Sequence, residues 1–209
     1  MPPGVLDKDD IVGYTSGMME QEAHAKPSKT AIRKQLRERL KHLATEGRKD
    51  DLIVEKIRRL DQWNESRQVF AFIPLPSEPD ITPLLDLAQK QGKQVLVPIC
   101  QENGIMHFAP LSQNWRDSLK VGRHNILCPA DDDVPGETPR KRLSPVILVP
   151  GLGYTADGAR IGRGGGYYDR YLQTWGRDLF KIGVCHRVQL LMEIPAEPYD
   201  QRVDIVVTD

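Results

Sequence analysis

Apolar residues recur along this chain at two spacings, which predict helices first and then strands. One helix face begins after Ser28, a residue type favoured at helix N-termini, and carries Ile32, Leu36, Leu40 and Leu43. A second helix face carries Ile53, Ile57 and Leu60. Short β-branched and aromatic runs then predict strands at residues 69–73, 95–99, 105–108, 146–149, 181–184 and 204–207.

The segment between the first two strands favours a parallel sheet. Residues 80–91 have helical spacing at Ile81, Leu84, Leu85 and Ala88, and the pattern stops at Gly92. A strand, a helix and a strand within about 30 residues form a βαβ unit with parallel strands. We therefore expect an α/β fold, a three-layer α/β/α sandwich with a mixed, mostly parallel sheet. The polar residues 130–144 are predicted to be a surface connection, because strands on both sides complete the sheet.

The length of 209 residues suits one ordinary domain, which we place at residues 26–209. Residues 1–25 carry one lysine against five acidic residues, so we expect an acidic, flexible N-terminal extension. This extension lacks the basic start and apolar run of a signal peptide. No segment approaches the roughly 20 apolar residues of a membrane span. We therefore expect a cytoplasmic protein with no membrane partner.

Charge and cysteine content narrow the classes of partner. Lysine plus arginine and aspartate plus glutamate each total 29, so no overall field attracts nucleic acid and no such partner is expected. Cys100, Cys128 and Cys185 are an odd, widely spaced set, which argues against disulfides and for a reducing compartment. The Cys/His spacing does not fit a structural zinc site. A monomer is the simplest expectation, although nothing in the sequence decides the oligomeric state.

The segment GARIGRGGGYYD, residues 158–169, combines five glycines, two arginines, two tyrosines and a carboxylate. It follows the buried strand at 146–149, and ligands of open α/β sheets lie beyond the carboxyl ends of strands. After Gly166, one helix face is marked by Tyr168, Tyr171, Leu172 and Trp175. The spacing therefore predicts a helix that starts near Gly166, with Tyr168 on its core side and Tyr167 in its first turn.

This arrangement predicts a polyphosphate site. Three consecutive glycines permit positive φ and close backbone approach, and free N–H groups at a helix start attract anions. Arg160 and Arg163 could donate to phosphate oxygens, and Asp169 could hold Mg²⁺. Taken singly, each feature has a simpler explanation: a flexible turn, surface arginines, and a carboxylate that stabilises the helix dipole. Their coincidence favours the phosphate site, although the segment is neither a Walker loop nor a dinucleotide fingerprint.

A second cationic pair, Lys29 and Arg33, lies one turn apart on the first predicted helix. A lysine in the first turn opposes the helix dipole, which indicates a negative group nearby. Residues 26–49 contain nine Lys/Arg and two Glu, so a basic solvated face explains the pair equally well. The pattern alone leaves both interpretations open.

These residues carry a resemblance to a known family. PGLGYTADGARIGRGGGYYDRYL resembles the signature of the 5-formyltetrahydrofolate cyclo-ligase family, also called methenyltetrahydrofolate synthetases. KTAIRKQLRERL, FIPLPSEPDITPLL and PYDQRVDIVVTD resemble further segments of that family, so the similarity extends from residue 28 to the C-terminus. It implies ATP- and Mg²⁺-dependent conversion of 5-formyltetrahydrofolate to 5,10-methenyltetrahydrofolate, with release of ADP and phosphate. In that chemistry the formyl oxygen is phosphorylated and N10 attacks the activated carbon.

The resemblance also implies roles for individual residues. The ATP-binding set is Lys29, Arg33, Arg160, Gly162, Arg163, Gly164, Gly165, Gly166, Tyr167 and Tyr168. The folate-binding set is Phe72, Glu78, Arg163, Gly164, Gly166 and Tyr167. Arg163 and Tyr167 are the implied catalytic residues. Asp169 and Asp200 are the implied magnesium ligands, with Asp204 as the second choice in place of Asp200.

The chain departs from the family pattern at three positions. Thr155 stands where an aspartate is common, Ile81 where a threonine is usual, and Cys128 where an acidic residue is common. The first bears on a hydrogen bond of the ATP loop and the others on the selectivity of the folate pocket.

Two other functions remain open at the level of the sequence. One is a non-catalytic nucleotide-binding relative that binds RNA or a protein partner through the basic helix at 28–49. The other is a sugar-phosphate or acyl-transfer enzyme of similar architecture, because a fold does not determine a function. The first would lack turnover with 5-formyltetrahydrofolate, and the second would bind its phosphorylated substrate without ATP.

Overall fold

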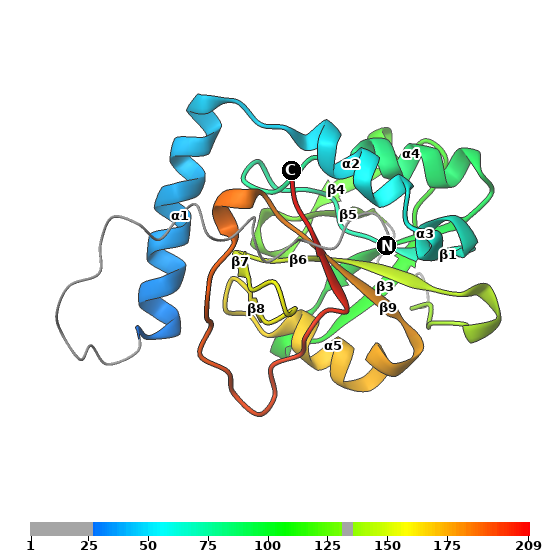
Figure 1. Ribbon diagram of the computed structural model, residues 1–209. Coiled ribbons are helices and arrows are strands. Elements are labelled where there is room, and N and C mark those ends of the chain that lie inside the picture. Colours follow the sequence, from blue (N-terminus) through cyan, green and yellow to red (C-terminus); the bar gives the residue numbers. More distant parts are fainter. Residues whose placement is uncertain (1–26, 131–135) are drawn as a thin grey trace, which may run out of the picture.

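The computed structural model describes residues 27–130 and 136–209. The expected N-terminal extension, residues 1–25, lies outside the described residues. So does the middle of the expected surface connection, residues 131–135. The described part contains a central sheet, helices on both of its faces, and a long helix at one end (Figure 1).

The central sheet confirms the predicted mixed, mostly parallel arrangement. Its strands are β1 (Gln68–Phe70), β2 (Gln94–Cys100), β3 (Met106–Pro110), β6 (Val146–Pro150), β9 (Phe180–Val184) and β10 (Ile205–Val207). The strand order is β10-β9-β6-β1-β2-β3, and only β2 and β3 pair antiparallel. β1 is shorter than the predicted strand at 69–73: it ends at Phe70, although the Ala71 N–H still donates to the Leu96 carbonyl of β2 at 2.8 Å.

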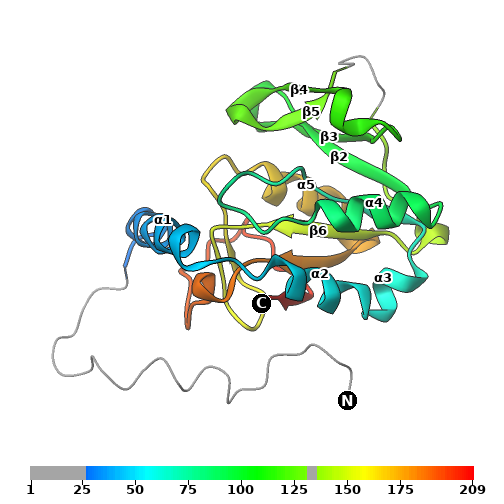
Figure 2. The same ribbon diagram turned by 90° about the horizontal axis from the view of Figure 1, so that it is seen from above.

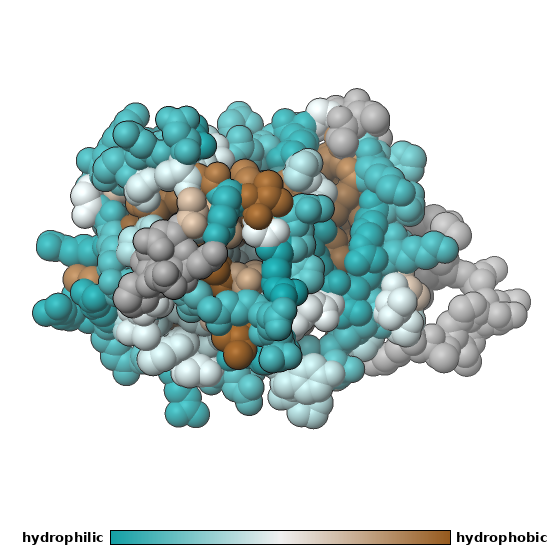
Figure 3. All heavy atoms as spheres, turned by 180° about the vertical axis from the view of Figure 1, so that it is seen from behind, coloured by the Kyte–Doolittle hydropathy of each residue, from teal (hydrophilic) through white to brown (hydrophobic). Residues whose placement is uncertain are grey.

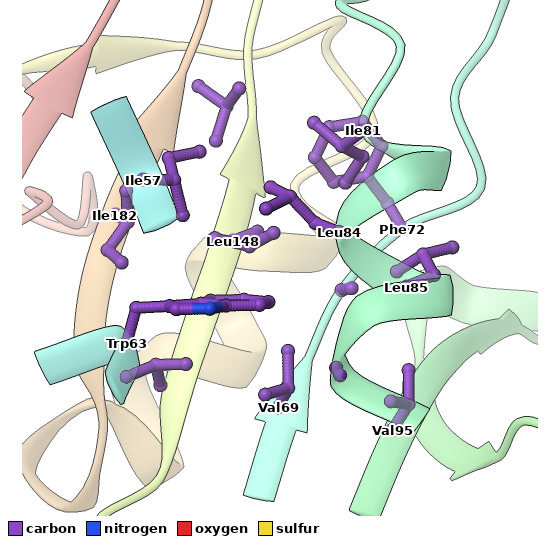
Figure 4. Packing of buried hydrophobic residues seen from close by; sticks show 14 of the residues in the cluster. Ile57, Trp63, Val69, Phe72, Ile81, Leu84, Leu85, Val95, Leu148 and Ile182 are labelled. Atoms are coloured by element: carbon purple, nitrogen blue, oxygen red, sulfur yellow. The ribbon is translucent and has the colours of Figure 1, made fainter. Parts of the chain in front are cut away.

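Helices cover both faces of this sheet, which confirms the three layers. They are α2 (Asp50–Arg58), α3 (Asp61–Glu65), α4 (Thr82–Lys90) and α5 (Tyr167–Trp175). Buried residues of α2, α3 and α4, such as Trp63, pack with Val69 and Leu148 (Figure 4). Tyr171 of α5 packs instead with Phe70, whose side chain points to the opposite face from that of Val69. The predicted helix at 80–91 is confirmed as α4.

The long helix α1 (Lys29–Glu46) packs across the loops beyond the strand ends (Figure 2). Its N-cap is Ser28, as predicted, and the serine hydroxyl accepts a hydrogen bond from the Ala31 N–H at 3.3 Å. A separate apolar cluster contains Ile32, Leu36, Leu40, Leu152, Ile161 and Ile194. Ile161 belongs to a small antiparallel hairpin of β7 (Gly153–Tyr154) and β8 (Arg160–Ile161), and Leu152 lies just before it. This cluster positions the N-terminal half of α1 above the hairpin.

A second hairpin, β4 (Leu119–Val121) and β5 (Leu127–Pro129), was not predicted. It lies beyond the β2–β3 edge of the sheet (Figure 2), with β5 against β2. Six short 3₁₀ turns complete the described elements: Glu102–Gly104, Trp115–Asp117, Arg123–Asn125, Lys141–Leu143, Gly176–Asp178 and Arg187–Gln189. In the described part of the surface connection, the Glu137 N–H donates to the Phe108 carbonyl at 2.8 Å, beside β3.

One face of the molecule is mainly hydrophilic. In the view from behind, polar side chains dominate and apolar ones show in separate patches between them (Figure 3). Among the described helices, none combines the length and apolar composition that a membrane crossing requires.

We expect Leu36→Ala to lower the free energy of unfolding by about 2–5 kcal/mol. Leu36 is 0 % exposed in the cluster that attaches α1, so truncation leaves a cavity there. Urea unfolding followed by circular dichroism measures the change. Gln35→Ala, at the exposed neighbouring position, is the matched control and should change stability by less than about 0.5 kcal/mol. Equal effects of the two variants would contradict the packing described for α1.

Candidate active site

A cavity of about 390 Å³ opens beyond the carboxyl ends of β1, β2 and β6. This is the place where open α/β sheets bind ligands. Its wall contains every site residue named from the sequence except Asp204: Lys29, Arg33, Phe72, Glu78, Arg160, Gly162, Arg163, Gly164, Gly165, Gly166, Tyr167, Tyr168, Asp169 and Asp200. Asp204 lies away from it, at the start of β10. There its carboxylate pairs with the Lys181 ammonium at 2.9 Å and accepts from the Lys181 N–H at 2.7 Å.

The glycine-rich loop between β8 and α5 has the backbone geometry predicted for an anion site. Gly164 has φ 112° and Gly166 has φ 68°, a left-handed conformation that favours glycine. Gly166 is the N-cap of α5, and none of the described side chains caps this helix. The first N–H groups of α5 are therefore not occupied by a side-chain cap where the loop meets the cavity.

A buried arginine ties the two ends of this loop together. The Arg160 side chain on β8 is 4 % exposed and donates from Nη2 to Asp169 Oδ1 on α5 at 2.8 Å. Its Nε has no hydrogen-bond partner among the described residues. Arg33 of α1 donates from its own Nε to the Gly162 carbonyl at 2.9 Å. Two guanidinium groups therefore lie along the loop, one from each side.

Lys29 forms the centre of an ionic cluster at the outer end of the cavity. Its ammonium lies 2.6 Å from Glu197 Oε2 and 2.6 Å from Asp200 Oδ2. Burial lowers the pKa of Lys29, but hydrogen bonds and charge attraction from these carboxylates outweigh it and leave the pKa above its usual value. Lys29 therefore stays protonated at neutral pH. Its side chain forms part of the cavity wall.

Glu78 occupies the inner end of the cavity and is 6 % exposed. Its Oε2 accepts from the Leu75 N–H at 3.0 Å, and its Oε1 accepts from Arg163 Nε at 3.1 Å. Arg163 also donates from Nη2 to the Ser77 hydroxyl at 2.8 Å. The carboxylate is thus held in one orientation, and Arg163 links it to the glycine-rich loop.

Apolar side chains also line the cavity, and some of them were not foreseen. Phe72 was expected in the wall, whereas Pro98, Cys100, Met106 and Ile126 were not. The Tyr168 ring packs on Phe108 at 6.5 Å between centroids, which confirms its predicted core side, and it also faces the cavity. Burial raises the pKa of the Tyr168 hydroxyl well above its usual value. No described residue makes a hydrogen bond with this hydroxyl.

Tyr167 closes another side of the cavity through contacts that the sequence did not reveal. Its hydroxyl donates to the Gln101 carbonyl at 3.1 Å and lies 3.2 Å from Nε2 of His124. His124 sits at the tip of the β4–β5 hairpin with φ 56°, followed by Asn125 with φ 59°. Neither Gln101 nor His124 belongs to a motif, so only the fold brings them to the site.

Two carboxylates of the cavity suit a magnesium ion that arrives with phosphate. Asp169 Oδ1 accepts from Arg160 and, at 3.2 Å, from the Gln201 N–H. Asp200 lies in the same wall. The described residues contain no group of three or more His, Cys, Asp or Glu side chains placed to hold a metal. Mg²⁺ is usually bound by one or two carboxylates together with substrate phosphates, so Asp169 and Asp200 fit that need.

Comparison with known proteins agrees with this geometry. The model of the 5-formyltetrahydrofolate cyclo-ligase family matches residues 25–209. The chain belongs to this family. It is therefore an enzyme of the ligase class.

Individual relatives of this cyclo-ligase span most of the chain. The 5-formyltetrahydrofolate cyclo-ligase of Mycolicibacterium smegmatis is 36% identical over 146 residues, which are 68% of this chain and 73% of that protein. The mouse enzyme of the same name is 28% identical over 188 residues, 86% of this chain and 93% of that protein. The solution structure of Aquifex aeolicus 5,10-methenyltetrahydrofolate synthetase has a TM-score of 0.71 and 27% identity, covering 86% of this chain and 89% of that one.

The three departures from the family pattern lie outside the cavity wall. Thr155 bonds to the Asp157 carboxylate and accepts from the Ala159 N–H at 3.0 Å, so a carboxylate two residues later completes the β7–β8 turn. Ile81 is fully buried in the core. Cys128 is buried behind β2 and β3 with aliphatic neighbours. In this cyclo-ligase the substitutions therefore change the support of the site and not its lining.

We expect Cys100 to react slowly with alkylating reagents, although it lines the cavity. Burial, with a smaller contribution from Cys128, raises the pKa of its thiol to about 11. The reactive thiolate is therefore scarce at pH 8, and its fraction grows about tenfold per pH unit until the pKa is reached. Mass spectrometry of the Cys100 peptide after timed iodoacetamide treatment measures the rate. The urea-unfolded chain is the control and should react about a hundred times faster. Similar rates in both states would show that the thiol is not protected.

Proposed function

We propose that this chain converts 5-formyltetrahydrofolate to 5,10-methenyltetrahydrofolate with ATP and Mg²⁺, releasing ADP and phosphate. The observation that carries the proposal is that one cavity has two different ends. Lys29, Arg33, Arg160 and the glycine-rich loop form one end, which we call the cationic end and in which Asp169, Glu197 and Asp200 also lie; Glu78 and apolar side chains form the other. Arg163 belongs to the glycine-rich loop of the first end and bonds to Glu78 of the second. A nucleotide and a folate could therefore meet at this guanidinium.

The cationic end would hold the triphosphate. The glycine backbone and the start of α5 offer N–H donors, and Arg33 and Arg160 flank them. Lys29 is paired with Asp200. When the nucleotide binds, its phosphate oxygens would pair with Lys29 and the metal ion would bind Asp200. Asp169 and Asp200 would hold Mg²⁺, which when bound offsets the negative charge of the phosphate oxygens.

The inner end would hold the pterin ring. A pterin has an amino group and a ring N–H on one edge, and a carboxylate can accept both hydrogen bonds. Glu78 is buried and already oriented by Leu75 and Arg163, so little ordering is needed when the ring binds. Phe72 and Met106 supply apolar contact for the ring faces.

Arg163 and Tyr167 would assist the reaction itself. The formyl oxygen forms a bond to the γ-phosphorus while the bond from that phosphorus to ADP breaks. N10 then attacks the formyl carbon, loses its proton, and expels the oxygen as phosphate. Charge gathers on the phosphoryl oxygens during the first step, and fixed cations stabilise such charge. We assign this role to Arg163, which bonds to Glu78, and to the hydroxyl of Tyr167, which lines the same cavity.

The structure disfavours the two rival functions. Two cations of α1 serve the cavity and not an outer surface, because Lys29 pairs with Asp200 and Arg33 bonds to Gly162, whereas Lys34, Arg37 and Lys41 remain exposed. A sugar-phosphate enzyme has no evident use for a buried carboxylate within an apolar pocket, as seen at Glu78. The free cysteines also suit the expected cytoplasmic enzyme. We propose that it acts as a monomer without nucleic-acid or membrane partners.

A direct assay tests the proposed reaction. Purified protein mixed with ATP, Mg²⁺ and 5-formyltetrahydrofolate should develop the near-ultraviolet absorbance of the methenyl product. Omission of ATP, or removal of Mg²⁺ with EDTA, should abolish the signal. Absorbance that develops without ATP, or none with all components present, would refute the proposal.

We expect Glu78→Gln to raise the KM for the folate about tenfold or more, because a charged hydrogen bond to the pterin is weakened. The KM for ATP should change by less than about twofold. Steady-state kinetics with each substrate varied in turn measure both constants. Asp80→Asn is the matched control, since Asp80 is exposed and its side chain accepts a hydrogen bond from the Thr82 N–H, which asparagine can also accept. An equal rise in both KM values would remove Glu78 from the folate site.

We expect Asp169→Asn to lower kcat about a hundredfold and to raise the Mg²⁺ concentration needed for half-maximal rate. Asparagine can still accept a hydrogen bond from Arg160, but it removes the charge that balances this buried guanidinium, so circular dichroism and urea unfolding must show that the variant is folded before its kinetics are compared. Asp204→Asn is the control, because Asp204 lies outside the cavity. If Asp204→Asn altered the Mg²⁺ dependence and Asp169→Asn did not, the proposed metal ligands would be wrong.

A further inference from the structure

The outer end of the cavity carries an aromatic ring with no role in the reaction described above. Tyr199 lines the cavity beside Lys29, yet it is 57 % exposed. Exposed large aromatic rings in a binding site offer a face on which flat ligand groups can stack. The nucleotide in the proposed function has one such group, its base.

Tyr199 is held in place although its ring is open to solvent. The Lys29 ammonium lies 5.7 Å from the ring centroid, and the Tyr199 hydroxyl bonds to the Glu197 carboxylate. Gln201 Nε2 donates to the Tyr199 carbonyl at 3.3 Å, and the Asp200 N–H closes a turn onto the Glu197 carbonyl at 3.0 Å. The ring is therefore positioned before any ligand arrives, which lowers the entropy cost of stacking.

The direction of the nucleotide points its base toward this ring. The terminal phosphate must lie near Arg163 to reach a folate held at Glu78, so the base must extend toward the opposite end of the cavity. That end contains Lys29 and Tyr199. The other aromatic side chains of the described wall are engaged elsewhere: Phe72 is buried, Tyr168 packs on Phe108, and Tyr167 bonds to Gln101.

We propose that the Tyr199 ring stacks on the base of the bound nucleotide and gives the site a preference for purine triphosphates. A purine presents a larger π-surface than a pyrimidine, so the stacking energy differs between them. This inference rests on the proposed function, because it assumes that the cationic end holds a nucleoside triphosphate.

Binding measurements on two variants test the stacking directly. Isothermal titration calorimetry should give a Kd for ADP that is about tenfold weaker for Tyr199→Leu than for the unaltered chain, while Tyr199→Phe stays within about twofold. Inorganic tripolyphosphate has no base, so its Kd should not change in either variant. An unchanged Kd for ADP in Tyr199→Leu would overturn the inference. So would an equal weakening of tripolyphosphate, because Tyr199 would then act only by positioning Lys29.

Turnover separates this inference from the proposed function. The ratio of kcat/KM for ATP to that for UTP should fall about fivefold to tenfold in Tyr199→Leu. In Tyr199→Phe the ratio should stay at the value of the unaltered chain. An unchanged ratio would overturn the purine preference while leaving the cyclo-ligase reaction intact. If the unaltered chain bound ADP in a Tyr199-dependent way but did not convert 5-formyltetrahydrofolate, the proposed function would fail and the stacking would stand.

Discussion

The ion pair between Arg160 and Asp169 is the interaction on which the site depends. It joins β8 to α5 and closes the glycine-rich loop between them into a fixed curve. Asp169 also receives the Gln201 N–H, so the C-terminal segment is drawn to the same point. Because the Arg160 side chain is almost fully buried, loss of its partner would leave an uncompensated charge inside the protein. Hairpin, loop, helix and tail are therefore organised around one pair of opposite charges.

The remaining charges of the site are matched with one another in a similar way. Lys29 pairs with Glu197 and Asp200, and Arg163 pairs with Glu78. Each partner faces a different ligand in the proposed reaction: the cations face phosphate, Asp200 faces the metal, and Glu78 faces the pterin. Such pairing keeps the side chains ordered. When a ligand binds in the proposed reaction, each charged side chain therefore exchanges one charged partner for another, and no unpaired charges are brought together.

The parts of this site that are contiguous in sequence could be predicted, and the parts that depend on tertiary contacts could not. The positive-φ glycines and the start of α5 follow from local spacing, whereas the phase of α1 left the role of Lys29 and Arg33 open and the family resemblance assigned them to the site. Glu78 and Asp200 were placed by family resemblance alone. The pairing of Lys29 with Asp200 spans 171 positions, and no local pattern encodes it. The β4–β5 hairpin, which brings His124 to Tyr167, is too short to give a clear alternation of apolar residues.

The separate packing of α1 has a consequence for how this enzyme should lose activity on heating. The helix contacts the hairpin and neighbouring loops through its own small apolar cluster, apart from the two clusters that hold the sheet. Regions with fewer buried contacts open at a lower free energy than the core does. Thermal detachment of α1 would withdraw Lys29 and Arg33 while the sheet remained folded. Inactivation should therefore precede global melting, and a bound nucleotide should narrow the gap between the two temperatures.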